Sequence, residues 1–146
     1  MDTEEELTGA LAALRRRSPE ELSAFIVSLL CGAPPGVRSY VEAFIAAAQP
    51  SEVATIVRRE ISVLRVGERE YDVRHRRSAE IVARAGYTLG IIERVVLPSD
   101  VALARELLVE LLDAEQQIAE QAYEDDYGTE ELFARVRSLL SASTER

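Results

Sequence analysis

The chain has 146 residues, the length of one ordinary domain, and its 17 basic and 26 acidic side chains give a net charge of −9. All of the basic residues are Arg, and the sequence contains no Lys. This absence excludes Schiff-base chemistry, biotin or lipoyl attachment and the lysine of a phosphate-binding loop. The negative net charge disfavours non-specific attraction to nucleic acid and to anionic lipid.

Two reactive residue types occur only once. The single cysteine, Cys31, cannot form a disulfide within the chain, and the single histidine, His75, cannot supply the paired histidines of most catalytic zinc sites. The apolar surroundings of Cys31 favour a packing role. Asp72, three residues before His75, favours a surface histidine beside a helix cap rather than a general-acid pair. We therefore expect no metal and no cofactor.

The first residues of the chain and its hydropathy favour a cellular compartment. The sequence begins MDTEEEL, which is acidic where a secretory signal peptide carries positive charge. No apolar run approaches the roughly 18 residues that a membrane span needs. Together with the single cysteine, these features predict a cytoplasmic protein without a membrane segment.

Helix-start signals recur along the chain as a Ser or Thr whose side chain can accept a hydrogen bond from an unpaired backbone N–H group. Thr3 and Ser18 are each followed three residues later by Glu, which is the capping-box pattern, and further starts are predicted at Ser51, Ser99 and Thr129. Gly and Pro residues mark the stops. Together with apolar residues spaced three and four apart, these signals predict seven helices, over residues 4–16, 19–31, 36–48, 52–66, 72–96, 100–126 and 130–142.

The two longest predicted helices carry the clearest apolar seams. The members of each seam step by three and four residues; they are Val82, Ala85, Leu89, Ile92 and Val96 in 72–96, and Ala104, Leu107, Leu111, Ala114 and Ile118 in 100–126. Because only residues 97–99 connect the two helices, we expect an antiparallel helical hairpin that forms the spine of the fold. Gly86 and Gly90 in the first arm predict a close helix approach or a bend.

The remaining helices are expected to pack around this hairpin. The helix at 19–31 is apolar nearly all round, which predicts that it lies between other helices. The sequence therefore predicts a single all-α domain over residues 1–146, either an antiparallel bundle or a short helical-repeat array. Four further apolar residues of the two long helices lie outside the seams, and either the short helices or a second copy of the chain must cover them. This also favours a homodimer. The four residues are Val95, Leu103, Leu108 and Leu112.

One stretch of the chain is rich in Arg. From Arg58 to Arg84 eight Arg stand among five acidic residues, and guanidinium groups suit the phosphates of a nucleic-acid backbone. The candidate nucleic-acid-binding residues are Arg58, Arg59, Arg74, Arg76 and Arg77. The alternative is neutralisation within the chain, because the antiparallel hairpin sets the Arg-rich start of one arm near the acidic end of the other.

The segment YEDDYGTEE, from Tyr123 to Glu131, is strongly acidic. It fails as a calcium-binding loop, because Gly128 at the sixth loop position places Tyr123 at the first and Ala134 at the twelfth, where carboxylates are needed. Its acids and tyrosines are candidates for contacting a basic partner; these candidate partner-binding residues are Tyr123, Glu124, Asp125, Asp126 and Tyr127. The alternative is a helix stop at Gly128, an acidic cap for the last helix, and tyrosines packed against the fold.

Two stretches of the second half carry a resemblance to known proteins. They are EYDVRHRRSAEIV and LLDAEQQIAEQAYEDDYG, the second being a helix that ends in an acid-rich turn with Gly. Through them residues 70–128 resemble helical-repeat segments of uncharacterised bacterial proteins, including those that accompany SWIM zinc fingers. The resemblance implies stacked helical hairpins that contact other proteins, although the Cys and His set of a zinc finger is absent from this sequence.

The residue inventory favours a function other than catalysis. The sequence carries no nucleophile–base pair, metal-ligand set, phosphate loop or glycine fingerprint, although carboxylate-only chemistry stays open. We therefore expect a non-enzymatic helical module that binds a protein partner or acts as an adaptor in a bacterial cytoplasm. The alternative is a nucleic-acid-associated helical protein that uses the stretch Arg58–Arg77.

Overall fold

The computed structural model of the chain describes residues 3–66, 74–122 and 128–144, and within them it describes no side chain at residues 3, 74–79 and 144. Every regular element in these ranges is helical, so the fold is all-α as predicted. The contacts group the chain into two units, Met1–Ala33 and Pro34–Arg146, where the sequence predicts one domain. The division falls directly before Pro34 and Pro35, because neither proline has the N–H group that would extend the preceding helix.

The first unit consists of two helices and the turn between them. Helix α1 spans Thr3–Arg15 and α2 spans Pro19–Gly32. Ser18 is the N-cap of α2, since its hydroxyl accepts a hydrogen bond from the backbone N–H of Glu21 at 3.1 Å. Pro19 occupies the first helical position, where its missing N–H group leaves no bond unmade. The helix start predicted at Ser18 is confirmed.

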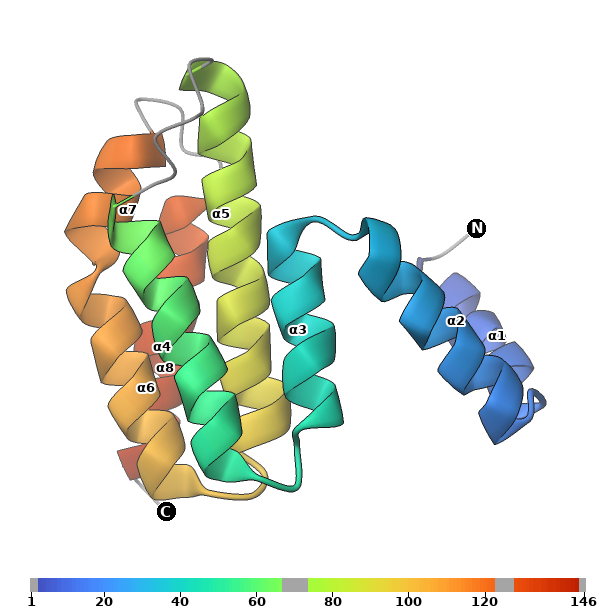
Figure 1. Cartoon of the computed structure of the whole chain (residues 1–146). Coiled ribbons are helices and arrows are strands. Elements are labelled where there is room, and N and C mark those ends of the chain that lie inside the picture. Colours follow the sequence, from blue (N-terminus) through green and yellow to red (C-terminus); the bar gives the residue numbers. More distant parts are fainter. Residues whose placement is uncertain (1–2, 67–73, 123–127, 145–146) are drawn as a thin grey trace. The chain divides into compact units, whose positions relative to one another are not determined.

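The second unit is a bundle in which α4 and α5 contact most of the other helices (Figure 1). Helix α3 packs on both of them, α7 packs on α5, and α6 lies on the side of α4 away from α3, with α8 against it. The elements of this unit are α3 (Pro35–Ile45), α4 (Pro50–Val66), α5 (Arg74–Ile91), η1 (Ile92–Val96), α6 (Val101–Asp113), α7 (Glu115–Ala122) and α8 (Thr129–Thr144). Among the described helices of both units, none combines the length and the apolar character that crossing a membrane requires.

The predicted hairpin is present in the second unit. Its arms run antiparallel, because η1, at the end of the first arm, packs on α6 while α5 packs on α7. Of the ten seam side chains nine are buried, and Val82 is half-buried. The spacing of three and four residues therefore predicts the core face of both arms correctly.

Neither arm is one uninterrupted α-helix, so the predicted continuous helix over 100–126 is wrong. The first arm ends in the wider π-helical turn η1, in which the N–H of Leu97 donates to the carbonyl of Ile92 at 2.8 Å. The second arm breaks at Ala114, whose N–H donates three residues back to the carbonyl of Leu111 at 3.1 Å. No Gly or Pro stands at this break, so the sequence carries no signal for it.

Two predicted helix-end signals have different roles in the structure. Asp100 rather than Ser99 caps α6, because the Asp100 carboxylate accepts a hydrogen bond from the N–H of Leu103 at 3.0 Å, while Ser99 still belongs to the preceding turn. Gly128 is the residue from which α8 starts, since its carbonyl accepts a hydrogen bond from the N–H of Leu132 at 2.9 Å. Its φ of +94° is a conformation that glycine adopts without strain. The helix stop predicted before Gly128 falls on residues 123–127, which lie outside the described residues.

The apolar residues off the seams are covered within the chain. Val95 and Leu108 are buried, and Leu103 and Leu112 are partly buried against the core. Of the two alternatives given above, the fold itself therefore covers these four side chains. These four side chains supply no reason to expect a second copy.

Helix α2 does not lie between other helices, contrary to the prediction. None of its residues is buried, and Phe25, Val27 and Leu29 are among the exposed large hydrophobic residues. The physical reason is the size of its unit, which contains only one other helix. A single neighbour cannot cover a helix that is apolar on all sides.

Close helix approaches occur at two glycines of the second unit. A Cβ atom on Gly90 would lie 2.9 Å from Nη1 of Arg94 and 3.0 Å from Cε2 of Tyr40, so the approach predicted at Gly90 is confirmed, whereas Gly86 has open space around it. A Cβ on Gly36, a position the sequence analysis did not single out, would lie 3.3 Å from the Cα of Arg84. The close contact between α3 and α5 therefore depends on the missing side chain of Gly36.

Candidate functional site

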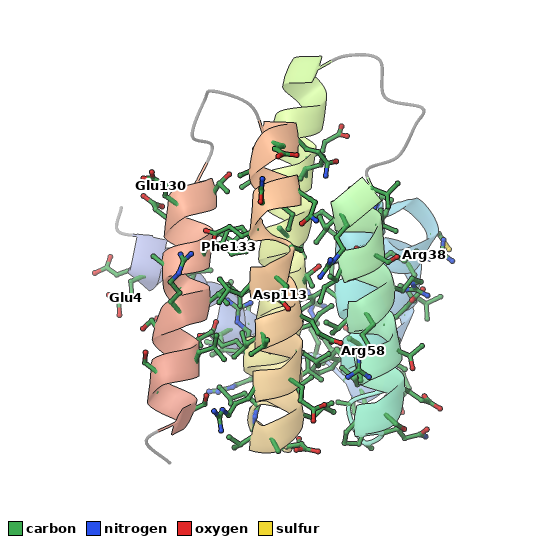
Figure 2. The ribbon with its side chains drawn as sticks, turned by 90° about the vertical axis from the view of Figure 1, so that its left-hand side faces the viewer. Glu4, Arg38, Arg58, Asp113, Glu130 and Phe133 are labelled. Atoms are coloured by element: carbon green, nitrogen blue, oxygen red, sulfur yellow. The ribbon has the colours of Figure 1, made fainter. Side chains whose placement is uncertain are left out.

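Two of the candidate nucleic-acid-binding residues are held in ion pairs. Arg58 on α4 pairs with Glu110 at 3.0 Å and with Glu106 at 3.6 Å, and Figure 2 shows it on the side of α4 that faces α6. Arg59 turns to the other side and pairs with Glu42 of α3 at 3.1 Å. Both side chains are neutralised within the chain, but by acids of α6 and α3 that the sequence analysis did not name. The contact that it predicted, between the Arg-rich start of the first arm and the acidic end of the second, falls on side chains outside those described.

The other candidate residues lie outside the described side chains. Arg74, Arg76 and Arg77 belong to the first turns of α5, but the structure describes only their backbone. The candidate partner-binding segment Tyr123–Tyr127 lies outside the described residues altogether. Both groups therefore stay predictions, and their roles can be tested directly by substitution.

A shallow groove of about 520 Å³ follows the contact between α4 and α6. Its lining residues are Arg58, Ala102, Arg105, Glu106, Val109 and Glu110. The two guanidinium groups and the two carboxylates balance in charge, and Val109 is the one large apolar side chain among them. A groove with this lining has no excess positive charge for a phosphate backbone and no nucleophile next to a base.

A buried polar cluster joins three helices of the second unit. The Glu60 carboxylate on α4 is 2% exposed, and it accepts hydrogen bonds from Ser39 on α3 at 2.7 Å and from Arg84 on α5 at 2.6 and 3.0 Å. Two of these bonds are made between opposite charges, which are the stronger kind. The cluster therefore ties α3, α4 and α5 to one another through a single carboxylate.

The importance of Glu60 is what the sequence analysis missed. There it counts only as one acid within the Arg-rich stretch. Glu60 stands three residues after Val57 and four before Leu64, both of which are buried, so it lies inside the apolar stripe of α4. A charged residue at such a position predicts a buried ion pair, because an unpaired carboxylate is very unfavourable in a core.

A further polar contact extends the packing of α3 toward the end of the first arm. Arg94 of η1 donates to the hydroxyl of Tyr40 on α3 at 3.4 Å, and this hydrogen bond raises the pKa of the Arg94 guanidinium. The Tyr40 ring meets the ring of Tyr87 on α5 edge-on, with 6.3 Å between the ring centroids. Since Arg94 stays charged, this contact positions helices and does not transfer protons.

Possible metal ligands do not gather among the described residues. Among them, no group of three or more His, Cys, Asp or Glu side chains could hold a metal ion. In the buried cluster both carboxylate oxygens of Glu60 are occupied by donors. A carboxylate in this state has the arrangement of a structural ion pair.

The first unit exposes six large apolar side chains, which together we call the α1–α2 surface. Its six members are exposed by between 41% and 67%; they are Leu7, Leu11, Leu14, Phe25, Val27 and Leu29. Acidic residues Glu4–Glu6 stand at the start of α1, and basic residues Arg15–Arg17 stand at and after its end. Exposed apolar side chains with charged neighbours are typical of a protein contact surface.

The sequence matches no protein-family model, and no curated protein or solved structure matches the chain either. The resemblance of residues 70–128 to bacterial helical-repeat segments therefore stays a prediction. The function has to be inferred from the residues of the chain itself, and the α1–α2 surface is a feature that the packing of the first unit does not explain.

Proposed function

We propose that the chain is a non-enzymatic protein-interaction module whose contact element is the α1–α2 surface. The observation that carries this proposal is the exposure of six large apolar side chains on a unit of only two helices. A partner that covers such a surface gains about 25 cal/mol for each Å² of apolar area removed from water. The oppositely charged ends of α1 add orientation, because charge complementarity selects how a partner docks.

We also propose that the module acts in the cytoplasm of a bacterium. Its only cysteine, Cys31, is exposed, so the packing role predicted from its apolar neighbours is wrong. A free exposed thiol is typical of proteins from a reducing compartment. The exclusive use of Arg among 17 basic residues favours a genome with GC-rich coding. Both features agree with the bacterial proteins that residues 70–128 resemble.

Nucleic-acid association through the stretch Arg58–Arg77 is the second candidate function. The ion pairs of Arg58 and Arg59 weigh against it, because a phosphate would have to displace a carboxylate from each guanidinium. The net charge of −9 adds repulsion at longer range. We therefore rank this function below the protein-interaction module.

Photo-crosslinking in the native host tests the proposed function. Benzoylphenylalanine at Phe25 reports on the α1–α2 surface, and the matched control is the same group at Ser62, an exposed polar position on α4. We expect protein adducts at Phe25 and none at Ser62. A third position, Tyr127, reports on the acidic segment. Adducts at Tyr127 without any at Phe25 would contradict the proposed contact element and favour that segment instead.

A further inference from the structure

The partner of the α1–α2 surface can be inferred from α1, and this inference rests on the function proposed above. Leu7, Leu11 and Leu14 are spaced by four and three residues, so they form one stripe along the helix. Every described side chain of α1 is exposed, and Leu7 is 67% exposed. A helix of 13 residues is only marginally stable alone in water, so its apolar stripe needs a cover.

The charge of α1 reverses from one end to the other. The first turn carries Glu4–Glu6, and the helix ends in Arg15–Arg17. This order suits the dipole of α1 itself, which favours acids at the start and bases at the end. It also makes α1 complementary to a second α1 that runs in the opposite direction.

The positions of these charged residues around α1 show which of them border the leucine stripe, where a second helix would pack, and which lie away from it. Arg15 stands eleven positions after Glu4, which is about three turns at 3.6 residues per turn, so both side chains emerge on the same side of the helix. That side borders the leucine stripe at Leu11. Glu5 and Arg16 form a second pair with the same spacing, but they lie on the far side of the helix from the stripe.

We propose that two copies of this chain form a homodimer on the α1–α2 surface, with their α1 helices paired antiparallel. When Leu7 lies opposite Leu11 of the second copy, Glu4 comes within reach of Arg15 of the second copy, and the two-fold axis repeats both contacts. In a parallel pair, Glu4 of one copy and Arg15 of the other lie eleven positions apart, about 16 Å along the axis, so no pair of opposite charges forms across the interface. A second copy in the antiparallel direction therefore complements both the stripe and its flanking charges.

Helix α2 enlarges the interface. A pair of helices with the length of α1 extends over only about 20 Å, which is too short to bury the roughly 1,200 Å² of a stable interface. Phe25 and Leu29 of α2 are exposed and one turn apart, so they form a second apolar row in the same unit. Two copies then supply four helices with apolar faces, which is the composition of a four-helix bundle.

Sedimentation equilibrium of the purified full chain at concentrations from about 1 to 200 µM tests the dimer. We expect a monomer–dimer equilibrium in which Glu4→Arg and Arg15→Glu each weaken association on the order of tenfold. The double variant Glu4→Arg/Arg15→Glu should restore association, because the exchanged charges again meet as opposites across the axis. The matched control, Glu5→Arg, makes the same charge change on the far side of α1 and should leave association unchanged.

Disulfide trapping tests the register in a Cys31→Ser background. A mixture of Leu7→Cys chains and Leu11→Cys chains should oxidise to a covalent dimer. Leu7→Cys chains alone should not, because the two copies of that position lie about 6 Å apart along the axis and on different helices, beyond disulfide reach. Trapping of Leu7→Cys alone, without trapping in the mixture, would contradict the antiparallel register.

The outcomes separate this inference from the proposed function. A monomer at every concentration, or equal weakening by Glu4→Arg and Glu5→Arg, overturns the homodimer. If the purified chain is monomeric and Phe25 forms adducts only with other proteins, the proposed function stands and the second copy is not its partner. If Phe25 forms no adduct with any protein, the proposed function itself is contradicted.

Discussion

Glu60 is a charged residue in the core of the second unit, and three hydrogen bonds from other side chains stabilise its carboxylate there. Removing a carboxylate from water is costly, and the attraction of Arg84 at 2.6 and 3.0 Å offsets this cost. Ser39 directs its single proton to the same carboxylate at 2.7 Å. The loss of Arg84 would leave a buried charge with one neutral donor.

Substitution of Arg84 should therefore be severe. We expect Arg84→Met to lower the free energy of unfolding by about 3–5 kcal/mol, because it leaves the Glu60 carboxylate buried without its charged partner. Urea unfolding monitored by circular dichroism measures this loss. The matched control is Arg38→Met, which removes an exposed ion pair with Glu42 and should cost less than about 1 kcal/mol.

The double variant Glu60→Leu/Arg84→Met identifies the ion pair as the cause. It removes both charges at once, so its cost should be smaller than the sum of the two single costs by more than about 1 kcal/mol. Strict additivity of the two substitutions would mean that the residues stabilise the core independently, and it would contradict the account given for this cluster.

At the scale of helices, burial of the two seams holds the arms of the hairpin together. Leu111 and Leu107 of α6 have no exposed surface, and they belong to the same core as Leu89 and Ile92 from the first arm. The breaks in the arms do not disturb this, because the spacing of three and four residues continues through both of them. Core packing, and not an unbroken backbone helix, therefore defines the hairpin.

The seam can be tested with one substitution on each side of α6. Leu111→Asp places an unpaired carboxylate where no water reaches, and we expect it to lower the free energy of unfolding by about 4 kcal/mol or more. Val109→Asp makes a similar change at a side chain that is 45% exposed, and it should cost no more than about 1 kcal/mol. Thermal unfolding of the two variants under the same conditions provides the comparison. A Leu111→Asp protein as stable as Val109→Asp would remove the seam from the core.

How far the sequence predicts these elements depends on whether the cause is local. The start of α2 is predicted because Ser18 and Glu21 are neighbours, and the core face of each arm is predicted because it repeats within the helix. The exposure of α2 depends on which other helices are packed nearby, and no local residue pattern encodes it. The break at Ala114 carries no Gly or Pro that would mark it, so the long prediction over 100–126 failed there.

The candidate sites also differ in whether their cause is local in the sequence or depends on the fold. The Arg-rich stretch is visible in the sequence, but the carboxylates that neutralise Arg58 stand about fifty positions later in α6, so only the fold brings them together. The α1–α2 surface consists of apolar residues that read as ordinary core residues until the small size of their unit is known. Glu60 was within reach of prediction, since its place in the apolar stripe of α4 is a local feature.

At the scale of the whole molecule, the distribution of charge separates the two candidate functions. The first unit contains three Arg and six acidic residues, so its ends carry charge of both signs while the chain as a whole is acidic. Part of the positive charge in the second unit is already used in ion pairs, which include Arg135 with Glu93 and Arg137 with Glu115. Long-range attraction of a phosphate backbone would therefore depend on residues whose side chains lie outside those described, above all Arg74, Arg76 and Arg77.

Binding of nucleic acid can be measured under conditions that favour it. We expect no binding of single- or double-stranded nucleic acid tighter than about 100 µM by fluorescence anisotropy at roughly 50 mM salt, because phosphate contacts are strongest there and the net charge still repels. The decisive comparison is between two variants that each remove three positive charges. One is Arg74→Ala/Arg76→Ala/Arg77→Ala, and its control is Arg105→Ala/Arg135→Ala/Arg137→Ala. Micromolar binding that disappears in the first variant and persists in the second would place the nucleic-acid function above the protein-interaction module. In that case each lost phosphate contact should also reduce the salt-dependence slope by about 0.7 to 0.9.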